Sequence, residues 1–125
     1  MALRDKVIEE AEKWVGYLEK ASNSQLESKT ANAGYNNYTI FAKWYKEYFG
    51  EDFQAQPWCA MFVSDMIYIG CGKKEVVPHF AYCPDSVNWF KRNGLWKTSN
   101  PQRGDVIFFR GSDGLACHVG LVSSA

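Results

Sequence analysis

The segment that decides the fold of this chain lies near its middle and reads Gln56-Pro57-Trp58-Cys59-Ala60-Met61-Phe62-Val63-Ser64. After Cys59, apolar residues recur at spacings typical of one face of a buried helix. These apolar residues are Phe62, Val63, Met66 and Ile67. Glycines at 70 and 72 are expected to stop the helix. The sequence therefore predicts a buried helix that carries Cys59 in its first turn.

Two further helices are predicted before this segment. Residues 3–20 carry an apolar stripe at helical spacing, and most of their charged side chains lie off the stripe. A polar stretch at 21–36 has no clear period, and long loops of this kind often carry function. A second helix is expected to begin near Asn37 or Thr39, because both residues suit a helix N-cap, and to end at Gly50.

The chain after the central helix is expected to form a short helix and then a β-hairpin. The short helix is predicted over 85–93. Residues 104–110 predict a strand whose apolar centre, Val106-Ile107-Phe108-Phe109, should be covered on both faces. After a turn, residues 116–123 predict its partner. Helices that precede strands indicate an α+β fold, with the helices packed on one side of an antiparallel sheet.

The composition of the chain limits the classes of protein to which it can belong. Its 125 residues suit a single domain over 1–125, and 14 Lys and Arg balance 14 Asp and Glu. This balance argues against a nucleic-acid partner, and no basic or long apolar run suggests a membrane partner. Residues 1–10 lack an uncharged apolar segment, so they do not have the pattern of a signal peptide.

The four cysteines allow three full disulfide pairings. Without a signal peptide, a reducing compartment and free thiols are expected. A zinc site can be drawn from Cys71, His79, Cys83 and Cys117, but the spacings differ from the C-x2-C of common structural sites. We therefore expect most of these cysteines to be small buried apolar residues, and we predict no metal ligands.

Cys59 is the candidate nucleophile. In the first turn of a helix, the dipole and unpaired backbone N–H groups lower the pKa of a thiol, and the same N–H groups can stabilise an oxyanion. Acyl transfer also needs a base. His118 on a predicted strand is better held than His79, which is expected to be a partly exposed loop residue. On spacing alone, Cys59 can instead be a packing residue and His118 a hydrogen-bonded histidine at a strand end.

Two further runs follow the segment at 56–64. They read Gly104-Asp105-Val106-Ile107-Phe108-Phe109 and Cys117-His118-Val119-Gly120-Leu121-Val122. In this order the three runs resemble the nucleophile motif, the first core strand and the histidine strand of CHAP domains, the cysteine, histidine-dependent amidohydrolase/peptidases related to NlpC-type and papain-like enzymes. With shorter matches at 36–39, 44–45 and 87–90, the resemblance covers nearly the whole chain.

This resemblance implies an enzyme that cleaves an amide bond of bacterial peptidoglycan, in the stem peptide, the cross-bridge or the N-acetylmuramoyl-alanine link. Cys59 would attack the carbonyl and His118 would act as base and then as acid, through an acyl-enzyme. No cofactor is implied. Some relatives bind calcium through an Asp-rich loop, and this sequence has no such pattern. The chain would suit a phage lysin held in the cytoplasm until its release to the cell wall, or a module of a larger or secreted lytic protein.

One departure from the family pattern concerns the third catalytic residue. The family usually places a Glu, Asn or Asp on the strand after the histidine strand, whereas this sequence stops at Ala125. We expect that the domain is truncated and lacks its last strands; alternatively, another chain or domain completes the sheet by strand addition. Both interpretations predict an unpaired sheet edge near Leu121 and reduced activity. Comparison with a chain extended beyond Ala125 would test them.

Several residues near the predicted pair could contact substrate. Trp58 could flank the cleft, and Asn37 and Tyr38 could line it. Alternatively, Trp58 and Tyr38 pack in the core and Asn37 caps a helix. Asp105 is expected to close the turn before its strand. Cys117 is expected to point away from the site, because adjacent strand residues face opposite sides.

Three functions compete at this point. The first is hydrolysis of the bacterial cell wall. The second is a non-catalytic wall-binding module that uses aromatic side chains as platforms for sugars. The third is a thiol-redox or zinc protein. One fast-reacting thiol would favour the enzyme, and four metal-bound thiols would favour the third function.

Overall fold

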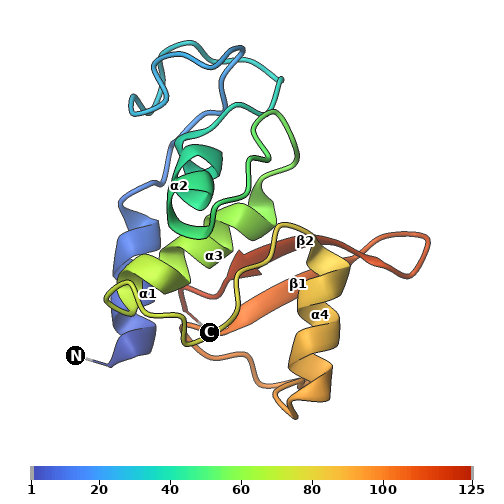
Figure 1. Ribbon diagram of the computed structural model, residues 1–125. Helices are drawn as coiled ribbons and strands as arrows, with labels where there is room; N and C mark the ends of the chain where they lie inside the picture. Colours follow the sequence, from blue (N-terminus) through green and yellow to red (C-terminus); the bar gives the residue numbers. More distant parts are fainter. Residues whose placement is uncertain (1, 125) are drawn as a thin grey trace.

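The computed structural model describes residues 2–124, and its elements follow the predicted order (Figure 1). The helices are α1 (Leu3–Glu12), α2 (Ile40–Phe49), α3 (Cys59–Gly70) and α4 (Cys83–Arg92), and the strands are β1 (Val106–Arg110) and β2 (Ala116–Leu121). The two strands form an antiparallel hairpin, so the α+β class is confirmed. None of the helices in residues 2–124 has the length and apolar character that crossing a bilayer would need.

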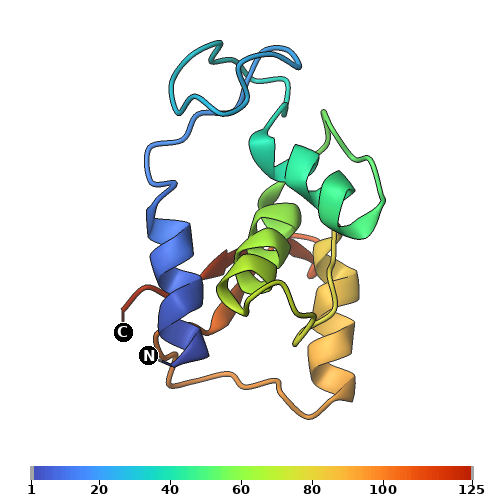
Figure 2. The ribbon, with the colours of Figure 1, turned by 60° about the vertical axis from the view of Figure 1, so that its left-hand side comes forward.

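Helix α3 is the centre of the molecule, because α1, α2 and β2 all pack against it (Figure 2). Its side chains Met61 and Met66 are fully buried. The close approach of α1 depends on Gly70, where an added Cβ would lie only 2.7 Å from the Cα of Val7. Gly70 is also the last residue of α3, and the chain turns away at Gly72, which has a left-handed φ of +72°.

Helix α1 is shorter than predicted, since it ends at Glu12 and not at residue 20. The chain turns over residues 13–16, and Gly16 has a left-handed φ of +90°. Of the stripe residues after Glu12, only Trp14 packs against α2, where it meets Phe41 edge-on, as Tyr17 also does. The other two, Val15 and Leu18, are exposed, so the predicted apolar face does not continue beyond α1.

The polar stretch at 21–36 is tied to the core through one tyrosine. The Tyr17 hydroxyl donates to the carbonyl of Leu26 at 2.6 Å and accepts from the N–H of Ile40 at 2.9 Å. Helix α2 then begins as predicted, with the Thr39 hydroxyl accepting a backbone N–H of its first turn at 3.1 Å. These bonds fix the start of α2 relative to the loop.

The hairpin is more exposed than predicted. Helices α3 and α4 both pack on β2, whereas the far end of the hairpin projects beyond them (Figure 1). Phe109 of β1 is consequently 49% exposed, so the prediction that both faces of this strand are covered is wrong. Within residues 2–124 each strand pairs only with the other, which leaves the expected unpaired edge beside Leu121.

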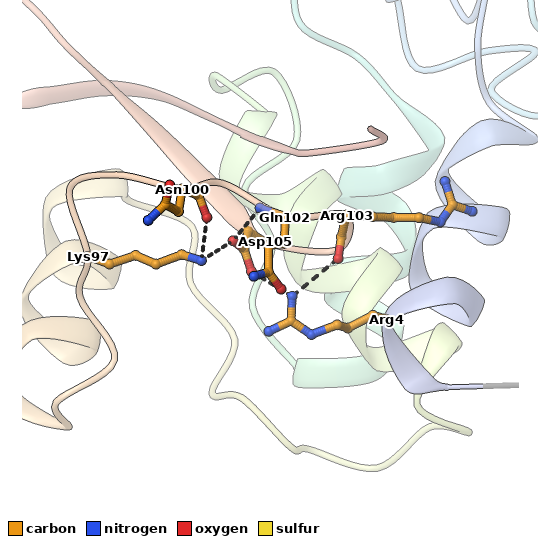
Figure 3. A network of polar contacts seen from close by, with 6 residues as sticks. All are labelled: Arg4, Lys97, Asn100, Gln102, Arg103 and Asp105. Carbon is orange, nitrogen blue, oxygen red and sulfur yellow. Dashed lines mark hydrogen bonds and ion pairs between the residues drawn. The ribbon is translucent and has the colours of Figure 1, made fainter. Parts of the chain in front are cut away.

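Asp105 connects α1, near the start of the described chain, with the segment that precedes β1 (Figure 3). Its carboxylate accepts from Arg4 of α1 at 2.7 Å, from Lys97 at 2.8 Å and from the backbone N–H of Gln102 at 2.8 Å. The bond to Gln102 closes the turn before β1, as predicted. Lys97, with smaller contributions from Gln102 and Arg4, lowers the pKa of Asp105 to about 2.

Replacing Asp105 by Asn is expected to lower the free energy of unfolding by about 1–3 kcal/mol, because hydrogen bonds between charged groups are lost. The pKa of about 2 lies below the ordinary 3.8, so the carboxylate stabilises the fold above about pH 4 and loses this effect as the pH falls through 2. Urea unfolding at pH 7 and at pH 2 would measure the difference. Asp113→Asn in the exposed hairpin loop is the control, and an equal loss in both variants would contradict the prediction.

Candidate active site

Cys59 is the first residue of α3, and the preceding residue leaves the helix start open. Trp58 stands at the N-cap position but offers no side-chain cap to the first turn. Its indole ring stacks on Phe41 at 5.5 Å between ring centroids, which anchors the start of α3 to α2. The backbone N–H groups of this turn remain available to a negative charge, as at other uncapped helix starts.

Strand β2 brings its backbone and His118 to the sulfur of Cys59. Val119 is buried with Ala60 and Val63, and this packing fixes β2 against the first half of α3. The backbone N–H of Val119 and the side chain of His118 then lie beside Cys59, where both favour the ionised thiol. The structure thus brings together the two residues predicted as nucleophile and base.

Cys83 is a third member of this site, whereas the sequence suggested for it only a core position or a place in the zinc site drawn above. It is the first residue of α4, and its side chain is buried as expected. Its sulfur lies 3.7 Å from the sulfur of Cys59. A signal was present in the sequence, because Cys83 directly precedes Pro84 at the start of a predicted helix, the kind of position that also singled out Cys59.

The two thiols have opposite pKa shifts. The pKa of Cys59 falls to about 5, mainly through a hydrogen bond from Cys83, with further help from the Val119 N–H and from His118 and against the effect of burial. The same hydrogen bond, together with burial, raises the pKa of Cys83. At neutral pH the pair therefore holds a thiolate on Cys59 and a proton on Cys83.

A β-bulge lies next to the histidine. Phe109 of β1 faces His118, but the next residue, Arg110, faces Ala116, so Cys117 is the extra residue on β2. The thiol of Cys117 is exposed and donates to the carbonyl of Phe109 at 3.5 Å. A bulge of this kind redirects neighbouring side chains, and it breaks the simple alternation predicted for this strand.

His79, the second histidine, makes packing and ionic contacts that hold two segments of the fold together. His79 stacks on Phe49 with ring centroids 4.2 Å apart, and it lies between the carboxylates of Glu75 and Glu51, the latter at 3.4 Å. It thereby holds the segment before α4 against the end of α2. No group of three or more His, Cys, Asp or Glu side chains in residues 2–124 is placed to share a metal ion.

The residues predicted to contact substrate have mainly structural contacts. Trp58 packs among the core aromatics, and Tyr38 pairs through its backbone with Lys20. Asn37 has a left-handed φ of +62° and donates its N–H to Glu19 at 2.8 Å; it does not cap α2, since Thr39 does. Among the described residues, none of these three side chains is hydrogen-bonded to Cys59 or His118.

Two exposed aromatic residues were not predicted as substrate contacts: Phe109, whose ring lies beside His118, and Tyr82, which directly precedes Cys83. Tyr82, directly before Cys83, is 59% exposed. Phe109 is also largely exposed, and its ring lies 5.6 Å from that of His118. Its exposure and its position beside His118 make Phe109 a candidate contact for a ligand. Within residues 2–124 no carboxylate or amide side chain is hydrogen-bonded to His118.

Replacing Cys83 by Ala is expected to raise the pKa of Cys59 by about one unit or more, because the thiolate loses a hydrogen-bond donor. The rate of alkylation by iodoacetamide, measured against pH, would report this change as a midpoint shifted upward from about 5. Cys83→Ser keeps a donor and should shift the midpoint less. Cys71→Ala, at the opposite end of α3, is the matched control, and an unchanged midpoint in Cys83→Ala would contradict the prediction.

A cysteine at the start of a central helix, facing a histidine on an antiparallel strand, defines the papain-like class of folds. The model of the CHAP domain family matches residues 51–125, and the chain belongs to this family. CHAP domains are generally hydrolases, and their activity is associated with peptidoglycan. The match leaves out residues 1–50, so it is narrower than the resemblance over nearly the whole chain suggested. Comparison with curated proteins and with solved structures gave no significant match.

Proposed function

We propose that this chain hydrolyses an amide bond of bacterial peptidoglycan through an acyl-enzyme on Cys59. The observation that carries the proposal is the Cys59 thiolate at an uncapped helix start, beside His118 and the Val119 N–H. Each of these groups lies inside the segment that matches the family. A stabilised thiolate at neutral pH is the state that a cysteine nucleophile requires.

The reaction follows from the positions of these groups. The Cys59 sulfur attacks the carbonyl carbon, and N–H groups of the first turn of α3 stabilise the resulting oxyanion. His118 takes the proton of the Cys59 thiol and gives it to the leaving amine. It then takes a proton from water, which attacks the thioester and releases Cys59. No cofactor is needed for these steps.

The substrate we propose is a stem peptide, a cross-bridge or the N-acetylmuramoyl-alanine bond. Phe109 would contact it, because this ring is exposed beside His118, and Tyr82 would contact it because it is exposed and directly precedes Cys83. Trp58 would contribute less than these two, since its ring is held in the core by Phe41 and Phe62.

Incubation with purified peptidoglycan tests the proposal. We expect soluble fragments that carry newly formed amino groups, and mass spectrometry of the fragments identifies the bond. A chain that sediments with the wall but releases no fragment would instead be a non-catalytic binding module, and this result would overturn the proposal.

A further inference from the structure

Two helix starts converge at the active site, and each begins with a cysteine. Cys59 opens α3, Cys83 opens α4, and their sulfurs are 3.7 Å apart. The other two thiols are elsewhere: Cys71 follows the last residue of α3, and Cys117 is bonded to the hairpin carbonyl of Phe109. In the hydrolysis proposed above, Cys83 only donates a hydrogen bond to the Cys59 thiolate, whereas two thiols at this distance can also react with each other.

We propose that Cys59 and Cys83 are joined in a reversible disulfide when the protein meets a peroxide, and that this bond switches hydrolysis off. The disulfide itself does not depend on the proposed function; only its effect on hydrolysis does. The sulfurs would have to close from 3.7 Å to the bonded distance of about 2 Å.

The two cysteines differ in accessibility in the way that this chemistry requires. Cys59 is only partly buried, so a small oxidant can reach it. Cys83 is 6% exposed and packs against Ala60, Val63 and Val119, so it is shielded from oxidant and meets Cys59 first. This is the usual division between a peroxide-reactive cysteine and a resolving cysteine.

The oxidation proceeds in two balanced steps. The Cys59 thiolate attacks one oxygen of hydrogen peroxide, the O–O bond breaks, and the products are a sulfenic acid and a hydroxide that takes a proton to become water. The Cys83 sulfur then attacks the Cys59 sulfur, the S–O bond breaks, and the hydroxide leaves as water with the Cys83 proton. Two thiols have lost two electrons to the peroxide, and an added dithiol reverses the reaction.

The proposed disulfide also protects the nucleophile. A sulfenic acid without a neighbouring thiol is oxidised further to a sulfinic acid, which a dithiol does not reduce. Because Cys83 converts the sulfenic acid of Cys59 into a disulfide, a dithiol can still restore the Cys59 thiol. The pair would therefore act as an off-switch and as protection against permanent inactivation.

The test compares the native sequence with Cys83→Ser and Cys71→Ser after treatment with hydrogen peroxide. In the native protein we expect the count of free thiols to fall from four to two, peptide mapping to link residues 59 and 83, and dithiothreitol to restore both thiols and peptidoglycan release. Cys71→Ser should form the same link. Cys83→Ser should form no such link and should add two oxygens to Cys59 irreversibly.

Two results would overturn the proposal: no link between 59 and 83 in the native protein, or full recovery of Cys59 in Cys83→Ser. Cys83→Ala repeats the test without a hydroxyl, and circular dichroism before oxidation establishes that each variant is folded. The thiol count and the peptide map do not use hydrolysis as a readout. If the link forms but neither the reduced nor the oxidised protein releases fragments, the thiol pair is upheld and the proposed hydrolase function fails.

Discussion

Replacing Cys59 by Ala is expected to lower the rate of fragment release from peptidoglycan by roughly 10⁴- to 10⁶-fold, as the loss of a covalent nucleophile does in other hydrolases. The alanine has no sulfur to form the acyl-enzyme, so His118 has no acyl-enzyme reaction in which to act as acid or base. Release of amino groups from purified peptidoglycan, followed over time, measures the rate.

The matched control for this variant is Cys71→Ala, which removes a thiol near the other end of α3 and should leave the rate unchanged. Binding to the wall should survive in Cys59→Ala, because Tyr82 and Phe109 remain exposed. Sedimentation with insoluble peptidoglycan measures that binding. Equal rates of release by Cys59→Ala and by the native sequence would show that Cys59 is not the nucleophile.

A second large effect is expected at Asp65, which lies inside α3 away from the reactive thiols. Its side chain is fully buried, and both carboxylate oxygens lack a hydrogen-bond partner. Burial raises the pKa of Asp65 to about 9, so the carboxyl group is neutral at pH 7. Burial is the main cause that raises the pKa of Tyr45 and Tyr48, and the Asp65 carboxylate, when it is ionised, adds to this effect, so Asp65 lies on the side of α3 that faces α2.

Replacing Asp65 by Asn is expected to make the protein more stable at neutral and alkaline pH. The pKa of Asp65 in the folded protein lies above the ordinary value of 3.8. The contribution of this carboxyl to the free energy of unfolding is therefore fully present below about pH 4 and is lost as the pH rises through 9. The cost of keeping this carboxyl buried reaches about 4 kcal/mol at pH 7, because one pKa unit corresponds to about 1.4 kcal/mol. The Asn side chain does not ionise.

Urea unfolding from pH 4 to pH 9 measures this effect. The free energy of unfolding of the native sequence should fall steadily as the pH rises over this range. That of Asp65→Asn should depend less on pH, and it should exceed the native value at the higher pH values. Asp52→Asn, at an exposed carboxylate, is the control and should follow the native curve. Parallel curves for Asp65→Asn and the native sequence would mean that Asp65 is ionised in the folded protein.

Much of this site could be predicted because its parts have strong local signals. The apolar period after Cys59 and the glycines beyond it indicate α3, and the apolar runs around a short turn indicate the hairpin. The order of Cys59 and His118 along the chain agrees with the family pattern. The structure brings the two residues together because Val119, next to His118, packs on α3.

Other features depend on contacts that a linear pattern does not contain. The predicted stripe of α1 continues past Glu12 through Trp14, which packs on α2, and through the exposed Val15 and Leu18, so the period alone could not locate the end of the helix. The bulge at Cys117 is a property of strand register and not of residue type. Cys83 reaches Cys59 only through the packing of α4 on β2, and nothing local predicts that distance.

The ion pair between Arg4 and Asp105 has a consequence for how the protein folds. It joins residues 101 positions apart, and the Arg103–Asp5 pair beside it spans 98. Closing a loop of this length costs conformational entropy before the contact can contribute to stability. We therefore expect these ion pairs to form late in folding. During synthesis, Arg4 and Asp5 can meet these partners only after the chain as far as Asp105 has left the ribosome. Contacts that form late in folding act mainly on the unfolding rate, so removal of these bridges is expected to speed unfolding more than it slows folding.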